Sequence, residues 1–75
     1  MLNRGDLGAD VAEWQEFLLT RGYTNPSGEP LIVDGDFGPD TEYATTRFQH
    51  DHGLEPTGVL CPETEAFARG LGWHE

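Results

Sequence analysis

Apolar residues recur with helical spacing near the start of the chain. Val11, Trp14 and Leu18 follow one another at intervals of three and four residues, and Phe17 widens the same face. The polar residues between them fall outside this face. The pattern predicts an amphipathic helix over residues 10–21.

This first predicted helix carries signals at both of its ends. Asp10 is placed to cap the N-terminus, with Glu13 in the reach-back position of a capping box. Gly22 follows the helix and supplies the left-handed residue at which many helices end. Residues 24–30 then hold two prolines and a glycine and predict a surface loop, which the short apolar run 31–33 fastens.

A second helix is predicted to begin at Pro39, because proline favours the first helical position. Ala44 and Phe48 lie four residues apart and form its apolar face. Gly53 ends the helix, and Leu54 folds back onto it.

A third helix is predicted to begin in the same way at Pro62. Thr64, Phe67 and Leu71 repeat with helical spacing and form the buried face, while Gly70 and Gly72 fray the end. The chain is therefore expected to be all-α, a small three-helix bundle with irregular connections.

An internal repeat relates the entries into the second and third helices. Residues 34–41 match residues 57–64 at a constant offset of 23. In each copy a glycine turn leads through an apolar residue into a proline-started helix that carries an acid and then a threonine. The matched structural positions are Asp34, Gly35, Phe37, Gly38 and Thr41 in the first copy, and Gly58, Leu60, Cys61 and Thr64 in the second.

Two glutamines stand beside core aromatic residues. Gln15 follows Trp14, and Gln49 follows Phe48. An amide next to a buried face can satisfy both donors and acceptors of a nearby loop. Both glutamines are therefore expected to be structural rather than ligand-binding.

Composition limits the chain to one small domain over residues 1–75. Hydrophobic residues make up 36% of it, and the single cysteine, Cys61, excludes an intrachain disulfide. The formal net charge is −10, with 14 acids, four scattered arginines and no lysine. Nucleic acid and anionic membranes need a clustered positive surface, so neither is an expected partner. The first residues lack the apolar core of a signal peptide.

The inventory of reactive side chains argues against an enzyme. Ser27 is the only serine and lies in the proline-glycine loop, and Cys61 is expected to fill a cap position. No spacing typical of a metal site exists among Cys61 and the three histidines, His50, His52 and His74. A bundle of this size also offers no groove deep enough to exclude water from a sugar. The sequence therefore predicts no catalytic site, no metal site and no cofactor.

The ordered motifs together resemble the peptidoglycan-binding domain often attached to bacterial wall amidases, endolysins and cortex hydrolases. The resemblance covers about residues 2–71, and its strength lies in the order and spacing of the pieces. The matching positions are Leu2, Arg4, Gly5, Asp6, Gly8, Asp10, Val11, Trp14, Gln15, Leu18, Gly22, Tyr23, Asp34, Gly35, Phe37, Gly38, Pro39, Thr41, Ala44, Phe48, Gln49, Gly53, Leu54, Thr57, Gly58 and Thr64.

The resemblance implies a non-catalytic three-helix module with an internal pseudo-repeat that tethers an enzyme or a virion protein to murein. The implied partners are peptidoglycan and a fused or associated hydrolase or virion component. The implied location is extracellular, at the cell wall or on a virion. The chain departs from the family pattern at Cys61, in the long connection over residues 24–33, and in its charge.

Ligand binding by such a module calls for exposed aromatic residues and a few fixed polar groups. Tyr23 and Tyr43 are the aromatic candidates, with Asp36, Arg47 and His50 as polar partners. Arg47 could hold a carboxylate of a stem peptide with two hydrogen bonds.

A second hypothesis follows from the charge of the chain. An acidic module that keeps this fold but has lost murein binding would serve as a protein-interaction or structural domain. Arginines and aromatic residues exposed together in a groove between helices would favour murein binding. A smooth acidic face with one apolar patch would favour the alternative.

Overall fold

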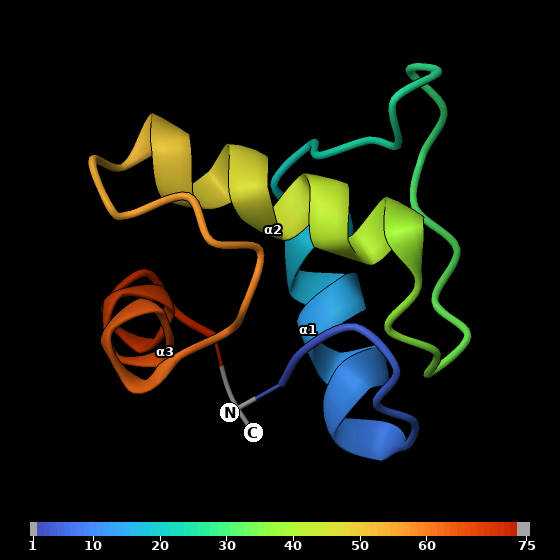
Figure 1. Cartoon of the computed structure of the whole chain (residues 1–75), viewed down its shortest axis with the longest axis horizontal. Coiled ribbons are helices and arrows are strands. Elements are labelled where there is room, and N and C mark those ends of the chain that lie inside the picture. The colour runs from blue at the N-terminus through green and yellow to red at the C-terminus, as the bar shows by residue number, and fades with distance from the viewer. Residues whose placement is uncertain (1, 74–75) are drawn as a thin grey trace.

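The computed structural model describes residues 2–73 and contains three helices. They are α1 (Ala9–Thr20), α2 (Pro39–Asp51) and α3 (Pro62–Gly70). Within residues 2–73 the only extended pairings are three isolated bridges. Figure 1 shows α2 lying across α1, with α3 to one side and a long connection between α1 and α2 on the other. The predicted all-α, three-helix fold is confirmed.

The N-terminal segment joins the two copies of the repeat. Leu2 and Leu60 exchange backbone hydrogen bonds of 3.1 and 2.7 Å. Three residues later, Gly5 donates to the carbonyl of Phe37 at 3.0 Å, and the amide of Phe37 donates to the carbonyl of Asp6 at 2.9 Å. The two loops that enter α2 and α3 therefore share one extended segment, and Phe37 and Leu60 are both fully buried against it.

The N-terminus of α1 differs from the prediction. The cap residue is Gly8, at φ 136°, and Asp10 lies inside the first turn with no side-chain cap bond at the helix start. The prediction that Asp10 caps α1 is therefore wrong. Gly8 takes a backbone conformation that brings its carbonyl to the amide of Ala12 at 3.2 Å, so the helix begins before Asp10. Asp10 instead places its charge near the positive end of the helix.

All three helices end in the same Schellman motif. In each, a left-handed glycine is followed by a residue whose amide reaches back to the third-last helical carbonyl. The reaching amides are those of Tyr23 (to Leu18, 3.1 Å), Leu54 (to Gln49, 2.8 Å) and Trp73 (to Ala68, 3.0 Å). The prediction of a frayed end at Gly72 is therefore wrong, because this glycine closes α3 and turns Trp73 into the core.

Aromatic rings fill the centre of the molecule. Trp14 is fully buried and meets Phe48 edge-on at 5.5 Å and Trp73 edge-on at 5.2 Å. Its indole donates to the Thr45 hydroxyl at 2.9 Å, so the polar end of the ring is satisfied inside the core. The other buried apolar residues are Val11, Phe17, Leu18, Leu31, Phe37, Ala44, Leu60 and Ala68.

The buried face of α3 is smaller than predicted. Thr64 and Ala68 are buried, whereas Phe67 remains 38% exposed. Phe67 lies at the edge of the core, with its ring 6.3 Å from Phe48 and 5.0 Å from His52. The prediction that Phe67 and Leu71 form the buried face of α3 together with Thr64 is therefore wrong, since Leu71 is also 36% exposed. Ala68 takes the fully buried position on α3 and leaves the phenyl ring at the border of the core.

Candidate functional site

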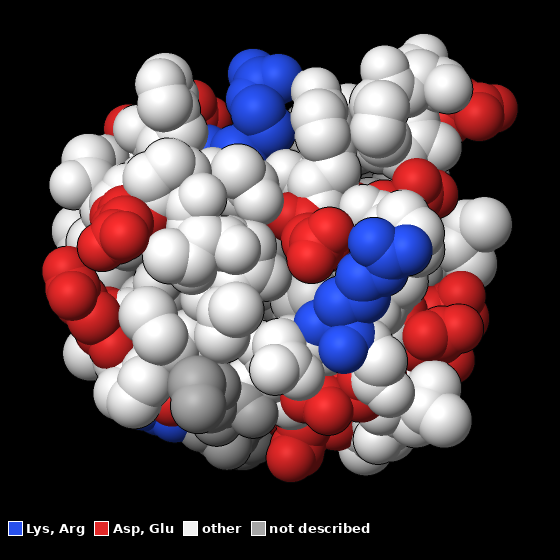
Figure 2. All heavy atoms as spheres, viewed as in Figure 1, with Lys and Arg blue, Asp and Glu red and all other residues white. Residues whose placement is uncertain are grey.

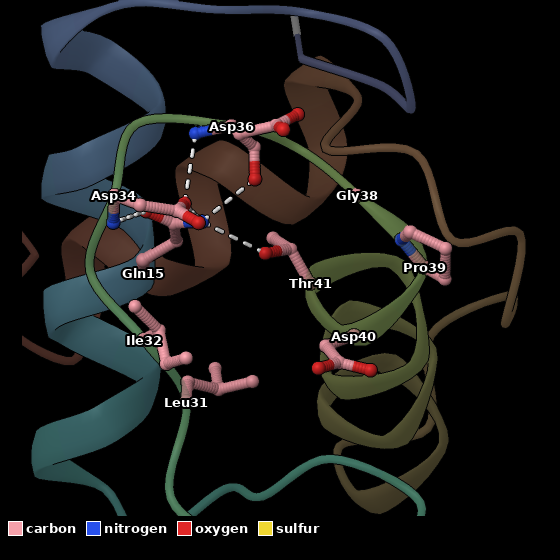
Figure 3. A pocket seen from close by; sticks show the side chains of 9 residues that line it. All are labelled: Gln15, Leu31, Ile32, Asp34, Asp36, Gly38, Pro39, Asp40 and Thr41. Atoms are coloured by element: carbon pink, nitrogen blue, oxygen red, sulfur yellow. Dashed lines mark hydrogen bonds between the residues drawn. The ribbon is translucent and has the colours of Figure 1, made fainter.

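Gln15 organises the loop that enters α2, and we call this arrangement the first glutamine clamp (Gln15 with residues 34–41). Its side-chain oxygen accepts hydrogen bonds from the amides of Asp34 and Gly35, at 3.0 and 2.9 Å. Its nitrogen contacts the carboxylate of Asp34, the carbonyl of Asp36 and the hydroxyl of Thr41 at 2.9–3.0 Å. Figure 3 shows the amide enclosed by the turn on one side and by Thr41 on the other. The side chain is 1% exposed, so these contacts replace its water.

Gln49 repeats this arrangement in the second glutamine clamp (Gln49 with residues 57–64). Its oxygen accepts from the amide of Gly58 at 2.9 Å. Its nitrogen donates to the carbonyl of Val59 at 2.8 Å and to the Thr64 hydroxyl at 3.1 Å. These acceptors correspond to Asp36 and Thr41 in the first clamp. The sequence repeat is thus also a repeat of hydrogen bonding.

Each clamp contains one position where the backbone favours glycine. Gly35 and Gly58 both take φ near +75°, a backbone angle that residues other than glycine rarely adopt. A Cβ on Gly58 would also lie 2.9 Å from Cγ of Glu42 and 3.0 Å from the hydroxyl of Thr46. The second clamp therefore packs directly against α2.

A first hollow, of about 210 Å³, opens beside the first clamp. Leu31 and Ile32 form one side, and the start of α2 with Asp40 forms the other, as Figure 3 shows. Asp36, a predicted ligand-binding residue, lies here. The pKa of Asp34 is lowered by the hydrogen bonds that its carboxylate accepts from the backbone of Asp36 and from Gln15. This hollow is acidic at neutral pH, and its hydrogen-bonding groups hold the loop together.

A second hollow lies between the end of α1 and the outer face of α2, and we call it the tyrosine–arginine hollow. It measures about 220 Å³ and is lined by residues 21–24 together with Tyr43, Arg47 and Asp51. The last three residues stand at successive turns of α2, so they share one face. The Schellman motif of α1 places Tyr23 against them. The hollow therefore forms where two elements cross.

Hydrogen bonds order the side chains of this hollow. The Tyr23 hydroxyl donates to Oδ2 of Asp51 at 3.0 Å, and Nη1 of Arg47 donates to the Tyr43 hydroxyl at 3.1 Å. Partial burial and the bond to Asp51 raise the pKa of Tyr23 from 10.0 to about 12. The bond to Tyr43 raises the pKa of Arg47. Tyr23 is thus a neutral donor and Arg47 a full positive charge at neutral pH.

The predicted ligand-binding residues are divided by the fold. Tyr23, Tyr43 and Arg47 lie together in the tyrosine–arginine hollow, whereas Asp36 lies in the first hollow. His50 is outside both hollows; its side chain is 77% exposed, and Nδ1 lies 3.9 Å from Oδ1 of Asp51.

Sequence reasoning missed four residues that line the tyrosine–arginine hollow. They are Arg21, Gly22, Thr24 and Asp51. The spacing of Tyr43, Arg47 and Asp51 at four-residue intervals was a usable signal, because it puts all three on one face of a helix. Nothing comparable in the local sequence pointed to Arg21 and Thr24.

The rest of the surface is mostly acidic. Figure 2 shows acidic side chains spread around one face of the molecule rather than gathered in one patch, with arginine side chains beside some of them. Leu7 and Ile32 are 77% and 72% exposed. Between residues 2 and 73, no helix is long and apolar enough to cross a bilayer.

Cys61 occupies the cap position before α3 and is partly exposed. Its sulfur lies 3.3 Å from the Thr64 hydroxyl, and this contact lowers the pKa of the thiol. Over the described part of the chain, no group of three or more His, Cys, Asp or Glu side chains could hold a metal ion. His74 lies outside the described residues.

Two solved structures share the fold of this chain. The chain is similar to the SleB N-terminal domain, with a TM-score of 0.82 and 31% identity over 93% of this chain and 89% of that one. It is also similar to the endolysin of Burkholderia phage AP3, with a TM-score of 0.78 and 34% identity. That match covers 89% of this chain and 24% of the endolysin.

Comparison of sequences also finds relatives of this chain. The chain is 38% identical over 63 residues to the zinc D-Ala-D-Ala carboxypeptidase of Streptomyces albus G, a match that covers 84% of this chain. It spans between 18% and 52% of the length of the curated relatives that it matches. Residues 8–67 match the family of peptidoglycan binding domains. Because this match covers most of the chain, the chain belongs to the peptidoglycan-binding domain family, which is found in wall hydrolases and endolysins.

Proposed function

We propose that this domain binds peptidoglycan through the tyrosine–arginine hollow. One observation carries the proposal: the hollow gathers both tyrosines and two of the four arginines of a chain whose net charge is −10. Phenol rings offer flat apolar surface with a polar tip, and guanidinium groups bind carboxylates with paired hydrogen bonds. Glycan and stem peptide supply both kinds of partner.

The proposed role is non-catalytic anchoring at the cell wall. The domain would hold a fused or associated wall hydrolase, endolysin or injection-machine component close to its substrate. Anchoring raises the local concentration of the attached protein without any new catalytic contact. The longer relatives, of which this chain matches only a part, support this division of labour.

Co-sedimentation with purified sacculi tests the proposal. Binding is measured from about 50 mM to 1 M NaCl, over which the screening length falls from about 14 to 3 Å. The sacculus and the domain are both anionic, so we expect binding to persist or strengthen as salt rises. Arg47→Ala should weaken it by about tenfold, which corresponds to the loss of about 1.4 kcal/mol. Arg4→Ala removes the same charge at a site outside the hollow and serves as the matched control.

The alternative function is an acidic protein-interaction or structural module. The exposed side chains of Leu7 and Ile32 in an acidic surrounding favour it. Absence of binding to sacculi at every salt concentration would reject the peptidoglycan proposal for this domain and favour the alternative.

A further inference from the structure

We infer that the tyrosine–arginine hollow recognises an α-ammonium carboxylate, a free amino acid end in which the amine and the carboxylate share one carbon. The inference rests on the proposed function and names the chemical group of the wall that the domain would read. It goes beyond binding of a carboxylate, because it assigns a role to the acidic residue of the hollow as well as to the arginines.

The charges of the hollow have both signs. Arg21 and Arg47 supply two guanidinium groups, and Asp51 supplies one carboxylate. Burial and then Asp51 raise the pKa of Tyr23 to about 12, and the two arginines oppose this rise, so all three charges lie close enough to act on the same hydroxyl. A ligand with only a carboxylate would meet Asp51 unfavourably, and a ligand with only an amine would meet the arginines unfavourably. A group with both charges is complementary to the whole hollow.

The donors and acceptors of the hollow are only partly used within the protein. Oδ2 of Asp51 accepts from Tyr23, whereas Oδ1 lies 3.9 Å from Nδ1 of His50, beyond hydrogen-bond distance. Arg47 uses Nη1 for the Tyr43 hydroxyl, and a guanidinium has five N–H donors. Asp51 can therefore accept from an ammonium while Arg47 donates to a carboxylate.

The size of the hollow fits the end of a chain. The hollow measures about 220 Å³ and is open to solvent, so it has room for an amino acid end. An uncrosslinked stem peptide whose last side chain carries a free α-ammonium carboxylate presents such an end.

The test compares two peptide probes on two proteins. One probe is a synthetic tripeptide whose side chain ends in a free α-ammonium carboxylate, and the other is the same peptide with that amine acetylated. By titration calorimetry, the parent protein should bind the free-amine probe about tenfold more tightly, a difference of about 1.4 kcal/mol. Asp51→Asn should lose this preference and bind the acetylated probe several-fold more tightly than the parent does.

Asp51→Asn keeps an acceptor for the Tyr23 hydroxyl, so the fold and the hollow are retained. Glu13→Gln removes the same charge from an exposed position on α1 and should leave the preference unchanged. Equal binding of the two probes by the parent, binding of neither, or an unchanged preference in Asp51→Asn would overturn the inference.

Two further measurements separate the sources of the group and the two proposals. In the first, free alanine competes with the peptide for the hollow. If alanine displaces the peptide at a concentration equal to the peptide's Kd, the hollow binds free amino acids, and a wall peptide is overturned as the ligand. Sacculi are also tested before and after acetylation of their amines, which should weaken sedimentation. Sedimentation that persists undiminished would reject this inference alone, whereas no sedimentation of untreated sacculi would reject the proposed function.

Discussion

At the scale of single residues, two buried amides determine how the chain enters α2 and α3. Each glutamine satisfies its oxygen and its nitrogen with backbone and side-chain groups of a loop that has no regular secondary structure. A glutamine suits this task because it combines two donors with an acceptor on one flat group. The loops are therefore ordered by these two side chains together with the backbone bonds to the N-terminal segment.

Replacement of Gln15 with leucine should destabilise the domain by about 2–4 kcal/mol. The change keeps the apolar volume but leaves the amides of Asp34 and Gly35 and the Thr41 hydroxyl without this partner, and an unsatisfied buried group costs about 1–3 kcal/mol. Urea unfolding followed by circular dichroism measures the loss. Glu16→Leu makes the same apolar side chain at the adjacent, exposed position, and equal effects of the two changes would contradict the role of the clamp.

The pH dependence of the free energy of unfolding should reveal the raised pKa of Tyr23. Its pKa is raised from 10.0 to about 12 in the folded protein, so the folded state holds the phenolic proton more tightly than the unfolded chain does. This contribution to stability is fully present below pH 10 and is lost as the pH rises through about 12. We expect the free energy of unfolding to fall over this interval. In Tyr23→Phe the fall should be smaller; an identical fall in both proteins would show that other groups cause it.

At the scale of elements, three copies of one C-terminal motif close the helices and direct a side chain inward. The motif after α3 carries the largest of these side chains, Trp73, which is 4% exposed and packs on Trp14. The short helix α3 thus owes much of its attachment to a residue that follows it.

Trp73→Ala should cost about 3–5 kcal/mol, a usual value for loss of a buried large aromatic residue. That loss is comparable to the whole stability of a small domain. Thermal unfolding should show a much lower midpoint or no cooperative transition at all. Leu71→Ala, at a residue that is 36% exposed in the same turn, should cost clearly less. Similar midpoints for the two variants would exclude Trp73 as the anchor of α3.

The positions of the helices could be predicted from the sequence, because proline and glycine mark their ends. Details that depend on packing could not. The spacing of Phe67 equals that of a buried residue, but α3 has nine residues and turns the smaller Ala68 to the core. The burial of Trp73 was not predicted, because Trp73 follows a glycine that was expected to fray the helix. The earlier pairs Gly22–Tyr23 and Gly53–Leu54 have the same pattern at the ends of α1 and α2 and could have indicated it.

The candidate site could likewise be predicted only in part. Tyr23, Tyr43 and Arg47 could be proposed by residue type and helical spacing. Arg21 could not, because the hollow exists only where the end of α1 meets α2, and local spacing does not encode a crossing of two helices.

At the scale of the whole molecule, charge repulsion acts across the entire body. The Cα atoms span about 24 × 24 × 20 Å, so most charges lie within two screening lengths of one another at about 0.1 M salt. With a net charge of −10, the folded state brings like charges together that the unfolded chain keeps apart.

Stability should therefore rise with ionic strength. We expect the thermal midpoint to increase by several degrees between about 10 mM and 0.5 M NaCl, since about 1 kcal/mol shifts a domain of this size by about 4–8 °C. Calorimetry at fixed pH measures the shift. A variant with Glu13, Glu16 and Glu63 changed to glutamine should show a smaller rise, and a midpoint that falls with salt in the parent would contradict the argument.

The hydrogen bonds on the inner face of α2 have a consequence for the speed of binding. Thr41, Thr45 and Gln49 tie this face to α1 and to the second clamp at successive turns, and the outer face bears Tyr43, Arg47 and Asp51. A ligand thus meets a backbone already in place, and only exposed side chains need to adjust, within nanoseconds. Stopped-flow association should then be a single phase whose rate rises linearly with ligand concentration, and weak or tight ligands should differ in how fast they leave.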